Sequence, residues 1–486
     1  MPSLNFLPAN WQIPGTYVAI DGSGAVSGTP AQRKAVLLLG LRRPTGTVAA
    51  QVLKPITSAS QGSTYFGRGS QLASMCAKFI EANAYAEVYA LALDEDAAGV
   101  KASCTITIVG AATADGTLNF VWGGRARKVG VTAGDSPTAI AAAIAAADTA
   151  DLDSQTTSTS ALGVVTVSAR HKGAYGNDLS IFHNYYTGEV TPSGISSVTI
   201  TAFASGATDP DIDDAIDTMG ADTQYYTIVP GWTGDANMDK LEAEMEDRWT
   251  SIRDLPGHSI AAFRGDYGAS QTYGNARNAR LTTVLATGLS PTSPWEWASS
   301  LAALEVAESD PARPRQNLKI VGVLAPLEAD RFNITERNLL LQDGMSTYKV
   351  VSGDSYIERM VTTYQLDANA NEDPSYHDIE ILRSLTYFRY GFSIRIARKY
   401  PNAKLADDGI VFAPGQVVMT PRLMRGEAIA FFDELAYQGI VEDRKGFLAD
   451  LVAIRDPNNP NGMLVNLPAN FVNQLRTTSA TISFKL

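Results

Sequence analysis

The sequence predicts a mixed α/β (α+β) protein of several domains, with a discontinuous α/β core, an inserted β-rich domain and extended arms at both ends. Two stretches alternate short apolar strands with amphipathic helices, which is the pattern of an α/β layered domain. The stretch between them is rich in Ala, Thr, Ser and Gly, and both chain ends lack this pattern. A length of 486 residues leaves room for about three domains.

The first thirty residues have the composition of an extended arm. They contain four prolines, several glycines and one β-favouring stretch, at residues 17–20. Proline and glycine at this density interrupt regular structure, so the segment does not pack by itself. We therefore expect residues 1–30 to form an N-terminal arm.

The core begins with a strand, a helix and a second strand. Residues 33–40 form an apolar run that ends on glycine, and residues 88–93 form another. Between them, residues 70–84 carry apolar side chains at helical spacing, at Leu72, Met75, Cys76, Phe79 and Ile80. This order of elements predicts an α/β layered domain.

The texture of the sequence changes after the acidic triplet at residues 94–96. Short β-favouring runs follow at residues 105–109, 117–121, 128–131 and 164–168. A helix is expected over residues 138–147, because Ser136 and Pro137 suit its N-cap and first position. We take residues 97–205 as a separate domain inserted into the core.

The α/β pattern then resumes, so that the core combines residues 31–96 with residues 206–376. We expect strands at residues 225–229, 259–263 and 318–324, and a helix over residues 238–253 whose apolar side includes Ile252.

A C-terminal domain is expected over residues 377–467, followed by a C-terminal arm over residues 468–486. Its predicted elements are helices at residues 378–387 and 422–438 and a strand at residues 447–454. The last seven residues alternate apolar and polar side chains, as a half-buried strand does. A strand at the terminus needs a partner sheet, in its own domain or in another subunit.

Charge and cysteine content exclude several classes of protein. With 39 basic and 51 acidic residues the net charge is −12, which repels nucleic acid and anionic lipid. Two cysteines, Cys76 and Cys104, cannot build a disulfide framework, and we expect both to be reduced thiols. The apolar runs are much shorter than the roughly 20 residues of a membrane span, and the N-terminus does not resemble a signal peptide. We expect neither export by that route nor membrane insertion.

No motif in the sequence assigns a catalytic role. The four histidines match no metal-ligand spacing, and neither HExxH nor GxSxG occurs. Residues 66–70 resemble a phosphate-binding turn but lack its Lys-Ser/Thr pair, so we expect a tight turn with Ser70 as helix N-cap. The cluster at residues 209–214 lacks the Gly and Glu of a calcium loop and suits a helix N-terminus. We expect no catalytic residue, no metal and no cofactor.

One basic stretch stands out in this acidic chain. No acid occurs between Glu380 and Asp407, and aromatic residues are interleaved with basic ones that include Arg389, Arg395, Arg398, Lys399 and Lys404. A solvated face explains the stretch, and so does contact with an acidic protein partner. Basic and aromatic residues together also occur in nucleic-acid sites.

Short motifs occur in a fixed order across nearly the whole chain. They are residues 13–18 (Ile-Pro-Gly-Thr-Tyr-Val), 66–75, 173–177, 310–314 (Asp-Pro-Ala-Arg-Pro), 336–338, 340–341, 362–364, 404–409, 420–421 and 472–476 (Val-Asn-Gln-Leu-Arg). Each motif alone is weak, but the series in this order is specific. With this series the chain resembles the tail sheath protein of Mu-like contractile-tailed bacteriophages.

This resemblance implies a structural subunit, not an enzyme, that polymerises with itself in stacked rings around a tail tube. Its contraction would drive the tube through the host envelope for genome ejection. The implied partners are the tube protein and the baseplate and tail terminator proteins, with no direct nucleic acid. The implied place is the virion, after assembly in the host cytoplasm.

The resemblance also implies roles for particular residues. The arms would lend strands to neighbouring subunits, and residues 97–205 would face outward. Strand contacts are expected at Tyr17, Val18 and Ile20 in the N-terminal arm and at Ala480, Ile482, Phe484 and Leu486 in the C-terminal arm. The candidate tube contacts are Arg389, Arg395, Arg398, Lys399 and Lys404.

Three other functions are weighed against this one. The sheath of a contractile bacteriocin or related injection machine would share the fold and mechanics. A self-assembling surface layer suits the Thr- and Ser-rich insert but would need a secretion signal. A hydrolase would need a catalytic constellation, and the motifs offer none.

Overall fold

The computed structural model describes residues 12–16, 30–413 and 415–485 of the chain. The chain folds as two compact units: the larger comprises Arg33–Ser384 with Asn473–Leu486, and the smaller comprises Leu385–Val472 with the segment that ends at Gln32. Each unit has its own hydrophobic core. The mixed α/β class predicted from the sequence is confirmed.

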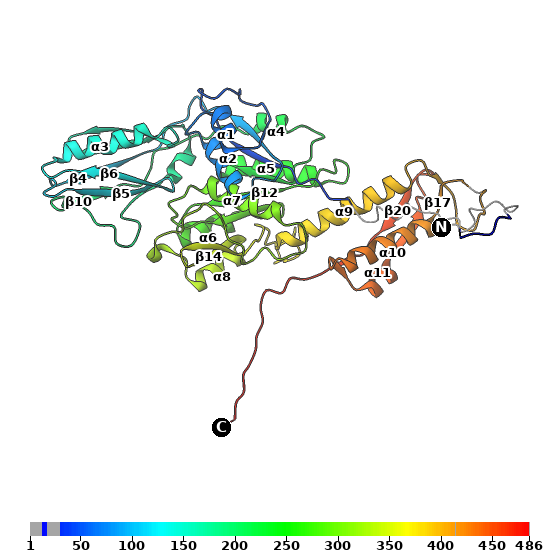
Figure 1. Ribbon diagram of the computed structural model, residues 1–486. Helices are drawn as coiled ribbons and strands as arrows, with labels where there is room; N and C mark the ends of the chain where they lie inside the picture. Colours follow the sequence, from blue (N-terminus) through cyan, green and yellow to red (C-terminus); the bar gives the residue numbers. More distant parts are fainter. Residues whose placement is uncertain (1–11, 17–29, 414, 486) are drawn as a thin grey trace. The chain divides into compact units, whose positions relative to one another are not determined.

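An eight-stranded sheet lies at the centre of the larger unit (Figure 1). Its strands are β1 (Val36–Leu41), β2 (Lys54–Ile56), β3 (Val88–Leu93), β11 (Thr227–Pro230), β12 (His258–Phe263), β13 (Thr282–Ala286), β14 (Met345–Val351) and β15 (Asp354–Arg359). They lie in the order β15-β14-β13-β12-β11-β1-β3-β2. The six inner strands are mutually parallel, and β2 and β15 are antiparallel edges. Parallel strands are covered on both faces, which explains their uninterrupted apolar sequences.

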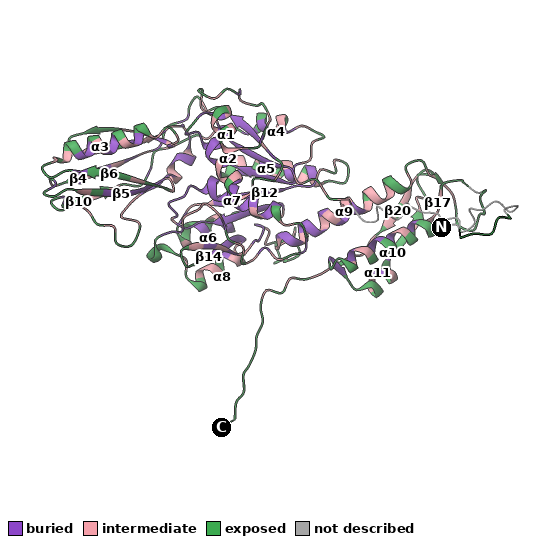
Figure 2. Cartoon of the chain, viewed as in Figure 1, coloured by how far each residue is buried: buried purple, intermediate pink, exposed green. Residues whose placement is uncertain are grey.

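Helices cover this sheet and bury its apolar side chains. α7 (Pro294–Ala307) packs against α2 (Gln71–Ala82) and against β11 and β12, and it is buried on nearly every side (Figure 2). Ser70 caps α2, since its hydroxyl accepts a hydrogen bond from the Ala73 N–H at 3.1 Å. The other helices of this unit's core are α1 (Ala59–Phe66), α4 (Asp213–Met219), α5 (Asp235–Trp249), α6 (Tyr267–Asn275) and α8 (Ile334–Gln342).

The segment between β3 and α4 forms two sheets of its own. One has the order β10-β4-β8-β7 and the other β6-β5-β9, and α3 (Pro137–Ala150) packs on them. The strands are β4 (Ser103–Val109), β5 (Gly116–Trp122), β6 (Arg125–Val131), β7 (Thr156–Ala161), β8 (Val164–Ala169), β9 (Ile181–His183) and β10 (Ser197–Ile200). The chain enters and leaves this segment side by side, because Val100 and Ala207 exchange backbone hydrogen bonds of 2.9 and 3.2 Å.

The smaller unit is built around two helices. α9 (Ile379–Lys399) begins in the larger unit and continues into the smaller one, where α10 (Pro421–Tyr437) and α11 (Arg444–Asp450) complete the helical part. Its core contains Phe388, Phe431, Phe432 and Phe447. Three two-stranded sheets accompany them: β16 (Lys404–Leu405) with β17 (Val418–Met419), β18 (Val441–Glu442) with β21 (Asn470–Phe471), and β19 (Val452–Arg455) with β20 (Met463–Asn466).

Strongly patterned segments fold as the sequence predicts. The helix expected over residues 70–84 is α2, and the strand expected over residues 88–93 is β3. Ser136 caps α3 through the Ala139 N–H at 3.3 Å, with Pro137 as its first residue. Capping residues and burial on one face are local properties, so sequence patterns detect them.

Three local predictions are wrong, wholly or in part. Residues 318–324 form no strand and make only an isolated bridge between Lys319 and Tyr356 of β15, whereas β13, which was not predicted, lies between β12 and β14. The strand predicted over residues 447–454 is confirmed only in its second half, which belongs to β19; the first half belongs to α11, whose N-cap Asp443 has a left-handed backbone with φ of 55°. α5 ends at Trp249, so Ile252 lies beyond the helix and is 97% exposed.

Candidate functional site: the assembly surfaces

A buried ionic network surrounds the first turns of α9 in the larger unit. Glu305 of α7 is fully buried and accepts from Arg383 Nε and Nη2 at 2.9 and 2.8 Å. Burial raises the pKa of Glu305, but the guanidinium groups of Arg383 and Arg315 outweigh this and hold it below its ordinary value. Arg383 also stacks on the Tyr226 ring at 3.8 Å. The network joins α7, β11 and α9.

The same region holds the chain where it leaves β21. Arg476 Nη2 donates to Asp378 at 3.1 Å and to Glu380 at 2.8 Å, and its Nη1 donates to Gln316 at 3.2 Å. Gln316 donates in return to the Leu475 carbonyl at 3.3 Å. Glu380 is fully buried, and its other oxygen accepts from the Arg315 backbone N–H at 2.6 Å. Residues 474–476, named here the tail root, are thereby attached to the larger unit.

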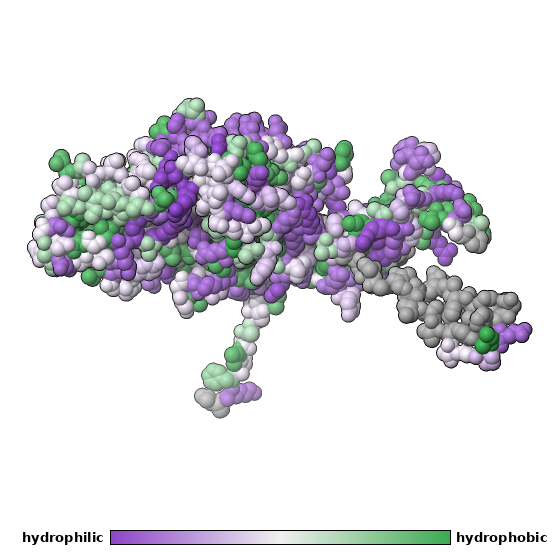
Figure 3. Space-filling model, turned by 45° about the horizontal axis from the view of Figure 1, so that its top comes forward, coloured by the Kyte–Doolittle hydropathy of each residue, from purple (hydrophilic) through white to green (hydrophobic). Residues whose placement is uncertain are grey.

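Residues 477–486, named here the tail, follow the tail root. Within the described residues the tail forms no helix or strand, and it is drawn as a single extended trace (Figure 1). Hydrophobic side chains are exposed along it (Figure 3); Ile482 is 90% and Phe484 is 79% exposed, and Ala480 is exposed as well. Leu486 lies outside the described residues. An exposed alternation of apolar side chains is typical of a strand without its sheet.

The two-stranded sheet β19–β20, named here the ribbon, also exposes apolar side chains, and its outer edges could accept a further strand such as the tail. Val452, Ile454 and Leu464 lie on one of its faces and are each nearly half exposed. The alternate residues are less exposed, and α10 packs against β19. No further strand pairs with either outer edge of the ribbon in the described part of the chain. Two-stranded sheets of this kind gain stability when another strand is added.

The basic stretch of α9 is largely neutralised within the smaller unit. Arg395 donates to Glu427 at 2.8 Å and to Glu434 at 2.9 Å, and Lys399 donates to Glu427 at 2.8 Å. Both acids come from α10, so an acid-free run in the sequence is not an acid-free surface. Lys404 donates to Gln416 at 2.7 Å, and Arg389 also has an interaction partner. Arg398 is exposed.

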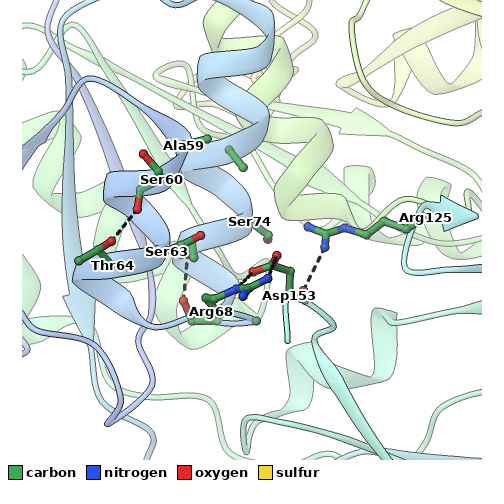
Figure 4. A pocket seen from close by; sticks show the side chains of 12 residues that line it. Ala59, Ser60, Ser63, Thr64, Arg68, Ser74, Arg125 and Asp153 are labelled. Carbon is green, nitrogen blue, oxygen red and sulfur yellow. Dashed lines mark hydrogen bonds and ion pairs between the residues drawn. The ribbon is translucent and has the colours of Figure 1, made fainter. Parts of the chain in front are cut away.

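A pocket of about 570 Å³ lies beside α1 and α2, where the inserted segment meets them (Figure 4). Arg68 forks onto both carboxylate oxygens of Asp153 at 2.8 and 2.6 Å, and Arg125 donates to the Asp153 carbonyl at 3.2 Å. Ser70 also lines this pocket, and its hydroxyl is committed to capping α2. The pair of Arg68 and Asp153 ties the insert to the core. The residues predicted as a turn with an N-cap are confirmed in that role.

The histidines and cysteines considered as candidate reactive groups make structural contacts or are buried. His171 Nδ1 lies 2.7 Å from Glu95, and His258 Nε2 lies 2.8 Å from Thr283; burial lowers the pKa of both histidines. Among the described residues, no group of three or more His, Cys, Asp or Glu side chains is placed to hold a metal ion. Burial raises the pKa of the Cys104 thiol to about 12 and that of Cys76 still further, so neither is reactive.

The acidic cluster at residues 209–214 is divided between two local roles. Asp211 and Asp213 form ion pairs with Lys240 at 2.6 and 2.8 Å. Asp209 instead accepts from the Tyr175 backbone N–H at 3.0 Å, which fixes the inserted segment to the core. Asp213 begins α4, as an acid at a helix N-terminus does.

The described residues do not include every predicted contact, and the sequence did not predict every partner of α9. Tyr17, Val18 and Ile20, the predicted contacts of the N-terminal arm, lie outside the described residues. The acids that neutralise α9 were missed, although Glu427 and Glu434 are seven residues apart and therefore share one helix face. No described helix is sufficiently long and apolar to cross a membrane.

Comparison with known proteins gives matches over both units. The phage tail sheath protein central domain matches residues 205–363, and the phage tail sheath C-terminal domain matches residues 371–485. The Mu-like prophage FluMu tail sheath protein of Haemophilus influenzae is 38% identical over 488 residues, which cover 100% of this chain and 99% of that protein.

Solved structures of sheath proteins are similar to this chain. The sheath tail protein of Listeria innocua has a TM-score of 0.50 at 13% identity, over 92% of this chain and 94% of that one. The sheath tail protein of Desulfitobacterium hafniense has a TM-score of 0.49 at 12% identity, over 94% and 100% of the two chains. With sheath domains matched over more than half of its residues and a sheath relative matched along its whole length, the chain belongs to the phage tail sheath protein family.

Proposed function

We propose that copies of this protein are joined tail to ribbon into a sheath that encloses a tail tube and contracts to drive the tube through a host envelope. The sheath would assemble in the host cytoplasm, dock on a baseplate and a terminator protein, and remain in the virion or prophage-derived particle. Its role would be mechanical, without catalysis and without a cofactor. Family membership supports the sheath role, and the tail and the ribbon support the manner of joining.

The single observation that carries the joining is the match between the tail and the ribbon. The tail exposes Ile482 and Phe484 at alternate positions, and the ribbon exposes Ile454 and Leu464 beside unpaired edges. A tail added as a third strand satisfies the backbone groups of one edge and extends the apolar face. Each fully buried Ile or Phe side chain contributes about 1.5–3 kcal/mol, so one joint is strong relative to the few residues that form it.

The tail–ribbon joint is tested by placing charge on the apolar face of the tail. We expect Ile482→Asp/Phe484→Asp to abolish sheath-like cylinders in negative-stain electron microscopy. The melting temperature of the monomer should stay unchanged because both side chains are exposed. Thr477→Asp/Ser479→Asp adds the same charge outside the predicted strand, at residues 477–479, and should still form sheath-like cylinders. Normal cylinders from the first variant would contradict the tail–ribbon joint.

Contact with the tube is proposed to rest on a narrower set of residues than the whole basic stretch. Arg395 and Lys399 are paired with acids of α10, and Arg389 and Lys404 also have partners, whereas Arg398 is exposed. An exposed arginine can attract an acidic tube surface without first breaking a bond inside its own subunit.

Charge reversal at Arg398 tests this contact. We expect Arg398→Glu to assemble into tubeless sheaths but to lose co-purification with the tube protein. Lys445→Glu makes the same charge change at another exposed position of the smaller unit and serves as the control. If both variants retain the tube equally well, Arg398 does not contact it.

A further inference from the structure

The chain passes from one unit to the other just before the tail. Val472 belongs to the smaller unit, where its N–H donates to the Ile440 carbonyl at 3.1 Å. The next residues belong to the larger unit, and the tail root holds them there. The tail therefore starts at a defined place on the larger unit, although the strand before it, β21, belongs to the smaller unit.

We propose that the tail root is a clamp, with Arg476 as its positioning residue, that sets where the tail begins and passes the load on the tail into α9. This inference rests on the proposed function, because it takes the tail as the link to a second copy. Arg476 reaches two carboxylates at once, Asp378 just before α9 and Glu380 in its first turn.

The chemistry of the contact favours arginine at this position. The Arg476 side chain is 16% exposed, and its guanidinium group donates to two carboxylates and one amide oxygen. A planar group with several fixed donors suits such a site, whereas the ammonium group of lysine is a single point of charge. Gln474 adds a weaker contact, since its Nε2 lies 3.4 Å from the Ala312 carbonyl.

The partners of Arg476 are themselves held firmly. Asp378 accepts from Arg359 Nε and Nη2, both at 2.8 Å. Burial raises the pKa of Asp378, but the Arg359 guanidinium outweighs this and holds the pKa below its ordinary value. Glu380 is held by the Arg315 N–H, and Arg315 donates to the Pro311 and Arg313 carbonyls at 2.9 and 2.7 Å. A pull on the tail is thus delivered to α9 and to the loop at residues 310–316.

The clamp also determines how readily the tail finds a ribbon. With the clamp closed, the linker before the predicted strand is residues 477–479; with it open, the linker is residues 473–479 and starts from the smaller unit. Once two copies touch elsewhere, the effective concentration of the tail at the ribbon falls with about the −3/2 power of linker length, so lengthening alone raises the protein concentration needed for half-maximal assembly by about threefold to fourfold. The changed starting point adds to this effect.

Arg476→Gln in the whole 486-residue chain tests the clamp, with Arg313→Gln as the control. Arg313 is exposed and pairs with Glu308 beside the clamp, and no hydrogen bond joins it to the tail root among the described residues. A nitroxide label on Thr477→Cys reports on mobility, since the native cysteines are buried and unreactive. We expect Arg476→Gln to narrow the label's spectrum to that of a label on Ser483→Cys, and to raise the half-maximal assembly concentration about threefold or more.

Further variants separate the clamp from the joint that it serves. If Arg476→Gln unfolds the monomer because Glu380 is left buried and unpaired, Arg476→Met/Glu380→Gln removes both charges and is measured instead. Deletion of residues 477–486 keeps the clamp and removes the linking strand. Normal assembly of the deletion would refute the tail–ribbon joint. Loss of assembly on deletion, together with an immobile label and normal assembly in the Arg476 variants, would refute the clamp alone.

Discussion

Arg395 of α9 donates from Nε to Glu427 of α10 at 2.8 Å, and this ion pair holds the two main helices of the smaller unit together. Glu427 also accepts from Lys399 at 2.8 Å and from the Tyr400 hydroxyl at 2.8 Å. Burial alone would raise the pKa of Glu427. The hydrogen bonds from these donors outweigh burial and hold that pKa below its ordinary value. Three donors on one carboxylate indicate a structural joint between helices.

Charge reversal at Arg395 should therefore unfold the smaller unit more easily. The Arg395 side chain is 16% exposed and Glu427 is 12% exposed, so Arg395→Glu leaves two carboxylates facing a third with little water between them. We expect a loss of about 3 kcal/mol or more in the free energy of unfolding, measured by chemical denaturation. Arg398→Glu, at an exposed position of the same helix, should cost less than about 0.5 kcal/mol. Equal stability of the two variants would contradict the joint.

The buried pair of Glu305 and Arg383 should be strongly coupled. Glu305→Gln leaves the Arg383 guanidinium buried without its counter-charge, and we expect a loss of about 3–5 kcal/mol in unfolding free energy. The double variant Glu305→Gln/Arg383→Met removes both charges and should lose less than the sum of the two single variants. Additive losses in this double-mutant cycle would show that the two side chains act independently.

The capping role of Ser70 predicts a modest and specific loss of stability. Ser70→Ala removes the acceptor for the Ala73 N–H in a fully buried position, and we expect a loss of about 1 kcal/mol. Ser60→Ala, at an exposed position of α1, is the control and should cost less than about 0.5 kcal/mol. Thermal unfolding monitored by circular dichroism measures both variants. Equal melting temperatures would show that the Ser70 cap does not stabilise α2.

Asp178 should make the larger unit less stable as the pH rises. Burial raises the pKa of Asp178 from 3.8 to about 7, although Arg264 nearby lowers it in part. Because the folded state holds this proton more tightly than the unfolded state, its stabilising effect is complete below about pH 4 and is lost as the pH rises to about 7. Asp178→Asn should flatten that part of the stability profile. A profile identical to that of the unchanged protein would show that Asp178 does not titrate there.

Sequence patterns predicted the helices and strands that are determined by neighbouring residues in the chain. α2 and α3 were predicted with their caps because Ser70 and Ser136 precede apolar residues at helical spacing. β13 was missed because its residues, Thr-Thr-Val-Leu-Ala, are polar in part and acquire strand character only through β12 and β14 on either side.

The candidate site was less predictable, because it depends on contacts between distant segments. The sequence indicated the alternation of the tail and the acid-free run of α9. It did not indicate that Glu427 would neutralise Arg395 or that Glu380 would bind Arg476, since 32 and 96 positions separate these pairs. Hydrogen bonds across such separations follow from the fold and from no short pattern.

The bridge between Val100 and Ala207 has a consequence for how the inserted segment tolerates changes in length. Those two backbone hydrogen bonds close the stem from which the inserted segment grows, so its first and last residues are held together whatever lies between them. The entropy cost of closing a loop increases only with the logarithm of its length, by about 0.6 kcal/mol for each doubling. Insertions or deletions within this segment should therefore leave β3 and α4 in place, so the stem separates changes in the segment from the fold of the eight-stranded sheet.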